Sequence, residues 1–136
     1  MIEISDEQFE SLIAEAMDAL AHKVARDMNN VAIVWADEPT PEQRRKMQLR
    51  PNQTLLGLYE GIPLPARNAA YNLVLPDKIT IFKNPMLMAC DSVESMRAQI
   101  LNTLWHEMAH HFGLDHTRIH ELDHLRRDSE SSNSLS

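Results

Sequence analysis

One eleven-residue segment constrains the fold of this chain more than any other feature, because its spacing is useful only on a helix. Residues 106–116 read His-Glu-Met-Ala-His-His-Phe-Gly-Leu-Asp-His, the pattern H-E-x-x-H-x-x-G-x-x-H. Residues four apart share one face of a helix, so His106 and His110 can bind one metal ion. Glu107 lies beside that pair, placed to reach a water ligand of the metal rather than the metal. The segment predicts a helix that carries a metal site with Glu107 as catalytic base.

The second half of the segment supplies a third histidine. Gly113 lets the chain leave the helix in a left-handed or otherwise tight conformation, and the chain can then bend back so that His116 reaches the same ion. Three imidazoles and one open position form the pattern of a catalytic zinc site, whereas structural zinc sites are closed. The single cysteine, Cys90, excludes a cysteine-cluster zinc site and an intramolecular disulfide. We therefore expect Zn²⁺ with His116 as the third ligand.

The other candidate site residues have weaker support from spacing. His111 lies inside the motif but about 100° around the helix from the preceding histidine, which favours packing or support of a ligand over metal binding. His120 and His124 continue a four-residue spacing from His116, and we interpret them as surface histidines unless His120 contacts substrate or steadies the site. The candidates for stabilising an oxyanion are Tyr59, Tyr71 and His120.

The remainder of the chain predicts an α+β domain: an N-terminal helix, a mixed sheet of three to four strands, the motif-bearing helix and a short C-terminal helix. The expected elements are a helix at about 6–28, strands at 31–36, 54–59, 71–75 and 78–82, a helical turn at 86–89, a helix from about 91 to 112 and a helix at about 117–127. Capping boxes begin two of the helices, Ser5 with Gln8 and Asp91 with Glu94. Thr40 and Pro41 are typical of the start of a short helix.

Length and charge restrict the classes of protein further. The 136 residues suit a single domain, expected over residues 1–127, followed by a Ser-rich disordered tail at 128–136. The net charge of −7 argues against nucleic-acid or membrane-surface partners, because phosphates attract the opposite sign. No apolar run approaches the roughly 18 residues of a membrane span, and the N-terminus lacks the features of a signal peptide. We expect a cytoplasmic protein.

The zinc motif resembles the metzincin signature, and residues 1–127 together resemble the minimal zincin-like metallopeptidase family of bacteria. Two further segments carry this resemblance: Gly-Leu-Tyr-Glu-Gly-Ile-Pro-Leu at 57–64 and Leu-Pro-Asp-Lys-Ile-Thr-Ile-Phe at 75–82. The resemblance implies a compact sheet, an active-site helix below it and a C-terminal helix. It also implies a peptide or protein substrate, Zn²⁺ as cofactor, and the site residues His106, His110, His116 and Glu107.

Three functions remain open at this point. The first is a zinc peptidase whose substrate pairs with an exposed strand edge, expected within 71–82. The second is a zinc endoribonuclease with the same three-histidine spacing, although such enzymes usually lack the glutamate found here at Glu107. The third is a non-catalytic, zinc-stabilised binding module, which the short chain and the absence of a methionine after His116 favour.

Overall fold

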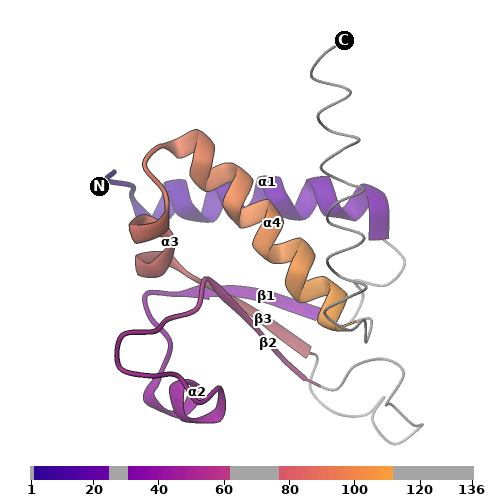
Figure 1. Ribbon diagram of the computed structural model, residues 1–136. Helices are drawn as coiled ribbons and strands as arrows, with labels where there is room; N and C mark the ends of the chain where they lie inside the picture. Colours follow the sequence, from indigo (N-terminus) through magenta and orange to yellow (C-terminus); the bar gives the residue numbers. More distant parts are fainter. Residues whose placement is uncertain (1, 25–30, 62–76, 112–136) are drawn as a thin grey trace, which may run out of the picture.

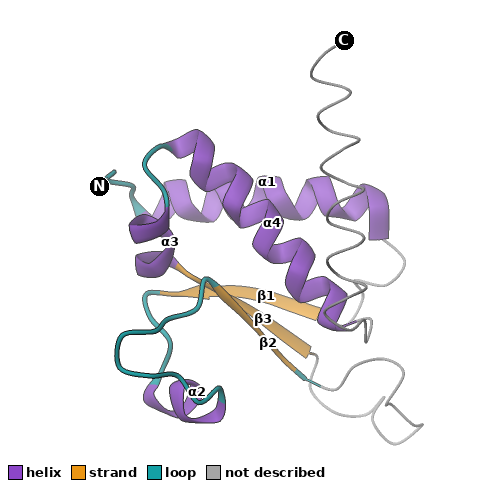
Figure 2. Ribbon diagram, in the orientation of Figure 1, coloured by secondary structure: helices purple, strands orange, loops and turns teal. Residues whose placement is uncertain are grey.

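The computed structural model describes residues 2–24, 31–61 and 77–111, with the backbone alone for 21–24 and 111. Two long helices lie over one face of a small sheet (Figure 1, Figure 2). The elements in chain order are α1 (Asp6–Val24), β1 (Val31–Ala36), α2 (Pro41–Lys46), β2 (Gly57–Glu60), β3 (Asp77–Phe82), α3 (Lys83–Ala89) and α4 (Val93–His111). The predicted α+β class is therefore confirmed.

Strand β3 is the central strand of the sheet, whose order is β1-β3-β2. It pairs in parallel with β1 and antiparallel with β2. The prediction of a free strand edge within 71–82 is thus wrong for residues 77–82, and residues 71–76 lie outside the described part. The physical reason is visible in the burial of β3, since all of its residues except Lys78 are buried. A strand buried on both faces belongs in the middle of a sheet.

Side chains near the first residue of a helix bind its free backbone N–H groups. The Ser5 hydroxyl accepts from the Gln8 N–H at 3.1 Å, and Gln8 Oε1 accepts from the Ser5 N–H at 2.8 Å, which confirms this capping box. Thr40 and Gln43 form the same reciprocal pair at the start of α2.

The predicted cap of the motif-bearing helix is displaced by one residue. Helix α4 begins at Val93, and its reciprocal hydrogen bonds join Ser92 to Ser95 at 3.2 and 3.0 Å rather than Asp91 to Glu94. Two serines satisfy the first N–H groups of the helix as well as an acidic pair would, because either hydroxyl can accept. Sequence pattern alone did not separate these neighbouring alternatives.

The core lies between the sheet and the two long helices. Its members on α4 recur every four residues and are fully buried. Helix α1 contributes the apolar stripe that helical spacing predicts. The core members are Phe9, Leu12, Ile13, Ala16 and Leu20 of α1, Met96, Ile100, Leu104 and Met108 of α4, and Ile79 and Ile81 of β3. Truncating one such buried side chain to alanine costs about 2–5 kcal/mol, so this stripe fixes the rotation of α4 above the sheet.

Several predictions concern residues outside the described part. These are the strand at 71–75, the helix at 117–127 and the disordered tail at 128–136. Within 2–24, 31–61 and 77–111, no helix combines the length and apolar character needed to cross a membrane.

Candidate functional site

The first half of the zinc motif lies on continuous helix. Helix α4 runs without a break to His111, so His106 and His110 occupy the i and i+4 positions of one helical face, as predicted. Both side chains are half-buried. Two imidazoles so spaced fit two positions of a tetrahedral zinc site. Within the described residues, no three His, Cys, Asp or Glu side chains converge as a ligand set.

The remaining predicted site residues are placed as follows. His116, His120 and Tyr71 lie outside the described residues, and of His111 only the backbone is described. Tyr59 lies on β2, and Glu107 lies on α4 against it. The structure therefore brings together two residues that the sequence separates by 48 positions.

Helix α4 packs against strand β2 because the strand offers a glycine at the crossing point. A Cβ at Gly57 would lie 2.6 Å from Cγ2 of Thr103, a distance that real Cβ atoms do not tolerate. Four residues of helix advance about 6 Å and two residues of strand about 7 Å. The step from Thr103 to Glu107 therefore matches the step from Gly57 to Tyr59, and Glu107 arrives beside Tyr59.

The backbone of Tyr59 binds the Glu107 carboxylate. The Tyr59 N–H donates to Oε2 of Glu107 at 2.9 Å. The Phe82 N–H donates to the Leu56 carbonyl at 3.0 Å, so these two residues form a hydrogen-bonded pair. Hydrogen-bonded and non-hydrogen-bonded pairs alternate along an antiparallel ladder. Tyr59 and Ile79, three positions further along the ladder, therefore form a non-hydrogen-bonded pair. The N–H of such a residue points away from the partner strand. Glu107 thus caps the outer edge of β2.

Burial changes the acid–base chemistry of Glu107. Desolvation disfavours its charged form and, against the opposing effect of the Tyr59 N–H, raises the pKa of the Glu107 carboxyl from 4.5 to about 7. A carboxyl with a pKa near neutral pH exchanges protons readily under ordinary conditions, which suits a general acid–base group.

The side chain of Tyr59 is held from the neighbouring strand. Its hydroxyl donates a hydrogen bond to Oδ2 of Asp77, the first residue of β3. Asp77 is only 5% exposed, and it lies so close to Gly61 that a Cβ there would collide with its side chain. The hydroxyl of this candidate oxyanion stabiliser therefore already has a protein partner.

The sequence interpretation missed three residues of this arrangement, namely Gly57, Asp77 and Thr103. Two of them lie in the family-like segments, where sequence alone assigns them no role. Thr103 carried a usable signal, because it precedes Glu107 by one helical turn and shares its face. The pairing of these residues depends on strand order, which no local pattern reveals.

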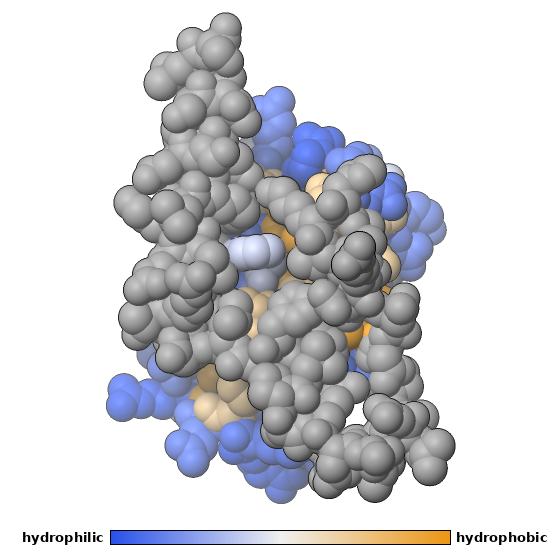
Figure 3. Space-filling view, turned by 90° about the vertical axis from the view of Figure 1, so that its right-hand side faces the viewer, coloured by the Kyte–Doolittle hydropathy of each residue, from blue (hydrophilic) through white to orange (hydrophobic). Residues whose placement is uncertain are grey.

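The surface near the end of α4 differs in character from a hollow elsewhere on the described residues. Seen from the side on which α4 ends, hydrophilic residues form the outer rim of the described surface and apolar residues lie toward its centre (Figure 3). A hollow of about 510 Å³ lies instead at the junction of α3 and α4. Eleven helical residues separate Ser95 in that hollow from His106, which is about 16 Å along α4.

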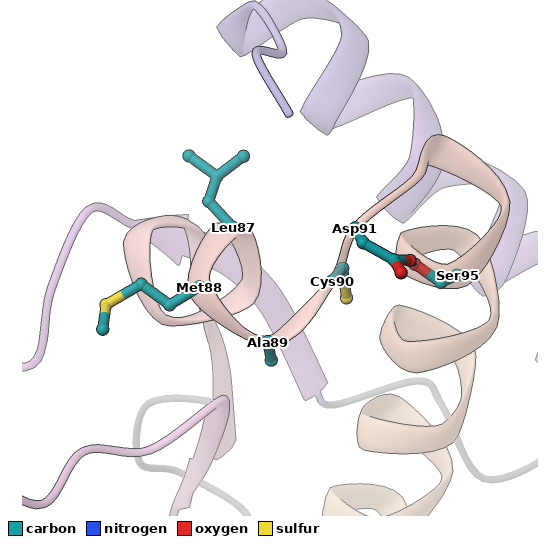
Figure 4. A pocket seen from close by; sticks show the side chains of 6 residues that line it. All are labelled: Leu87, Met88, Ala89, Cys90, Asp91 and Ser95. Atoms are coloured by element: carbon teal, nitrogen blue, oxygen red, sulfur yellow. The ribbon is translucent and has the colours of Figure 1, made fainter. Parts of the chain in front are cut away.

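None of the described residues that line this hollow belongs to the zinc motif. Its lining consists of Leu87, Met88, Ala89, Cys90, Asp91 and Ser95. Figure 4 shows the Asp91 and Ser95 side chains meeting at the start of α4 while Met88 extends away from them, and Ser95 donates to Asp91 at 3.3 Å. Burial raises the pKa of the Cys90 thiol, so it is a poor nucleophile there.

Comparison with known proteins identifies a family. Residues 28–125 match the family model described as zincin-like metallopeptidase. Among solved structures, the chain is similar to a conserved hypothetical protein from Thermus thermophilus, with a TM-score of 0.53 and 18% identity over 80% of this chain and 94% of that one. Similarity at this identity shows the fold alone. No curated protein sequence matches the chain.

Proposed function

Because the chain belongs to the zincin-like metallopeptidase family, we propose that it is a zinc-dependent peptidase with Glu107 as its general base. One observation carries the proposal. A half-buried carboxyl with its pKa raised to about 7 directly follows His106 and is held by a backbone N–H from β2. An ordinary surface glutamate on a packing helix would have none of these features.

The metal would be held by His106, His110 and His116. The first two share a helical face, and the third ends the motif, three residues after Gly113. When bound, Zn²⁺ supplies a water molecule with a pKa of about 7 and polarises the scissile carbonyl. Imidazole nitrogen is a donor that zinc prefers, so the chemistry of the donor set fits the ion.

Glu107 would move the proton. Its Oε2 accepts the Tyr59 N–H, so Oε1 is the oxygen that would take the proton of the attacking water. The same carboxyl would then pass that proton to the leaving amine. In the chain without metal the pKa of this carboxyl is about 7, so it can both accept and return a proton near neutral pH.

The substrate would be an extended peptide pairing with β2. Among the described strands, β2 pairs with β3 on one side only. The alternation of bonded pairs directs the backbone N–H and C=O of Gly57 outward on its other side, two residues before the Tyr59 N–H that donates to Glu107. Main-chain hydrogen bonds at such an edge bind a peptide without demanding a particular sequence.

The decisive experiment compares the wild type with Glu107→Gln, both loaded with zinc, on a mixed fluorogenic peptide library. We expect Glu107→Gln to keep its zinc and to lose at least about 100-fold in kcat, the usual range for loss of a general base. Glu94→Gln is the matched control, because Glu94 is exposed in the first turn of the same helix. Undiminished hydrolysis by a zinc-loaded Glu107→Gln protein would show that the proposed mechanism is wrong.

The same preparation distinguishes the two other functions. A wild type that hydrolyses no peptide but loses thermal stability when a chelator removes zinc would favour the binding module. Cleavage of RNA by the zinc-loaded protein, with binding that weakens steeply as salt rises, would favour the endoribonuclease.

A further inference from the structure

The two segments that carried the family resemblance outside the zinc motif are neighbours in the sheet. Residues 57–60 form β2, residues 77–82 form β3, and the strands pair antiparallel with Tyr59 opposite Ile79. Side chains two residues apart on a strand share a face. Asp77 therefore lies on the same face as Tyr59, one step further along β3, and this face is the one covered by α4.

Asp77 is held in its position at the start of β3 by contacts on two sides. It accepts the hydrogen bond from the Tyr59 hydroxyl, and it fills the space where a side chain at position 61 would lie. Gly61 is the residue that makes room for it. A carboxylate that is 5% exposed is costly to bury unless polar groups bind it, so the bond to Tyr59 stabilises this placement.

Tyr59 is thus bound at both ends. Its hydroxyl is bound to Asp77 on β3, and its backbone N–H donates to Oε2 of Glu107 at 2.9 Å. Strand β2 has only four residues and, within the described part of the chain, one neighbouring strand. Such a short edge strand opens easily unless side chains tether it.

We propose that Asp77 is a positioning residue, which acts through Tyr59 to hold the β2 backbone N–H on the Glu107 carboxylate. The inference rests on the proposed role of Glu107 as the base. Asp77 reaches Glu107 through Tyr59, whose hydroxyl it binds. Its function is to keep one carboxylate oxygen fixed, so that the other faces the substrate in a single orientation.

The experiment uses the zinc-loaded full chain and two mild variants, Tyr59→Phe and Asp77→Asn. Tyr59→Phe removes the hydroxyl and keeps the backbone N–H. Asp77→Asn keeps an acceptor oxygen and the shape of the side chain. We expect kcat to fall about tenfold in Tyr59→Phe and less in Asp77→Asn, with zinc affinity unchanged, since the interaction orients Glu107 and not the histidines.

The control is Thr80→Val on the same strand. Thr80 is buried and pairs with Leu58, but its hydroxyl has no hydrogen-bond partner among the described residues. The substitution therefore disturbs the same strand pair without touching the Asp77–Tyr59 bond, and it should leave kcat unchanged. The double variant Tyr59→Phe/Glu107→Gln should be no slower than Glu107→Gln alone, because residues that act through one group are not additive.

Amide hydrogen exchange at residue 59 gives a readout that does not depend on activity. In the proposal, protection of this amide falls in Tyr59→Phe and Asp77→Asn and stays at the wild-type value in Thr80→Val. The proposal is overturned if protection is unchanged in both variants, or if protection falls while kcat does not. An inactive wild type would reject the peptidase function separately, and the exchange data would still decide whether Asp77 holds the Tyr59 N–H.

Discussion

Gly57 on β2 and Thr103 on α4 approach so closely that a Cβ on the glycine would lie 2.6 Å from the threonine methyl group. This contact sets the distance between the motif-bearing helix and the edge strand. One helical turn later, the same approach allows the Tyr59 N–H to reach the Glu107 carboxylate. The position of the Glu107 carboxyl therefore depends on a packing contact between Gly57 and Thr103.

The first prediction tests that contact. Gly57→Ala should lower the free energy of unfolding by about 1–3 kcal/mol, because the added methyl group has no room. Thr103→Ser removes the opposing Cγ2 and keeps the hydroxyl that accepts from Gln99 at 3.2 Å. The double variant should therefore be more stable than the sum of the single changes by at least about 1 kcal/mol, measured by urea denaturation. Additive effects would show that strand and helix do not meet at this point.

The second prediction concerns pH and the metal-free protein. The pKa of Glu107 is raised from 4.5 to about 7 in the folded state, so the folded protein binds more protons than the unfolded chain between these values. This contribution to stability is fully present below about pH 4.5 and is lost as pH rises to about 7. We expect the wild type to lose about 3 kcal/mol relative to Glu107→Gln across that window. If the difference in unfolding free energy between the two proteins is constant from pH 4.5 to 8, the pKa of Glu107 is not raised by folding.

The third prediction compares two ion pairs. Lys83 is only 8% exposed and donates to Asp6 at 2.6 Å, whereas both side chains of the Arg97–Glu15 pair are about half exposed. Asp6→Asn should cost about 1–3 kcal/mol, because it leaves a buried ammonium without its charged partner.

Glu15→Gln is the matched control for that pair. It should cost less than about 1 kcal/mol, since an exposed pair is screened by water. Thermal melts of the two variants check the order, and equal losses would show that burial of Lys83 does not matter.

The fourth prediction identifies the third zinc ligand. His106→Ala and His110→Ala should each abolish stoichiometric zinc after dialysis, because each removes one of three protein donors. His116→Ala should do the same, whereas His120→Ala and His124→Ala should keep about one zinc per chain. Metal analysis of the five purified variants gives the result. Retention of zinc by His116→Ala together with its loss in His120→Ala would assign the third position to His120.

Much of this protein was predictable from short stretches of sequence. The spacing of His106 and His110 on a helix, the capping box at Ser5 and the apolar stripe of α1 all depend on residues within one or two turns of each other. Their physical basis is the fixed period of the helix and the need to satisfy its first N–H groups. Even the incorrect cap at Asp91 was wrong by a single residue.

The order of the strands was not predictable in this way. An alternating run such as 78–82 fits a central strand or an edge strand equally well until its neighbours are known. The two strands that flank β3, namely β1 and β2, come from segments far from it in the chain. The edge beside Glu107 therefore belongs to β2, and the expectation of an edge within 77–82 failed.

The sequence by itself determined the helix, the two histidines that share one face of it and the carboxyl beside them, because these follow from the 3.6-residue period alone. Tertiary structure decided the environment of that carboxyl. The glycine that admits the helix, the strand N–H that binds Glu107 and the buried Asp77 that holds Tyr59 come together only when α4 packs on the sheet. Burial then raises the pKa of Glu107, since desolvation depends on every element packed around the group and not on its neighbours in sequence.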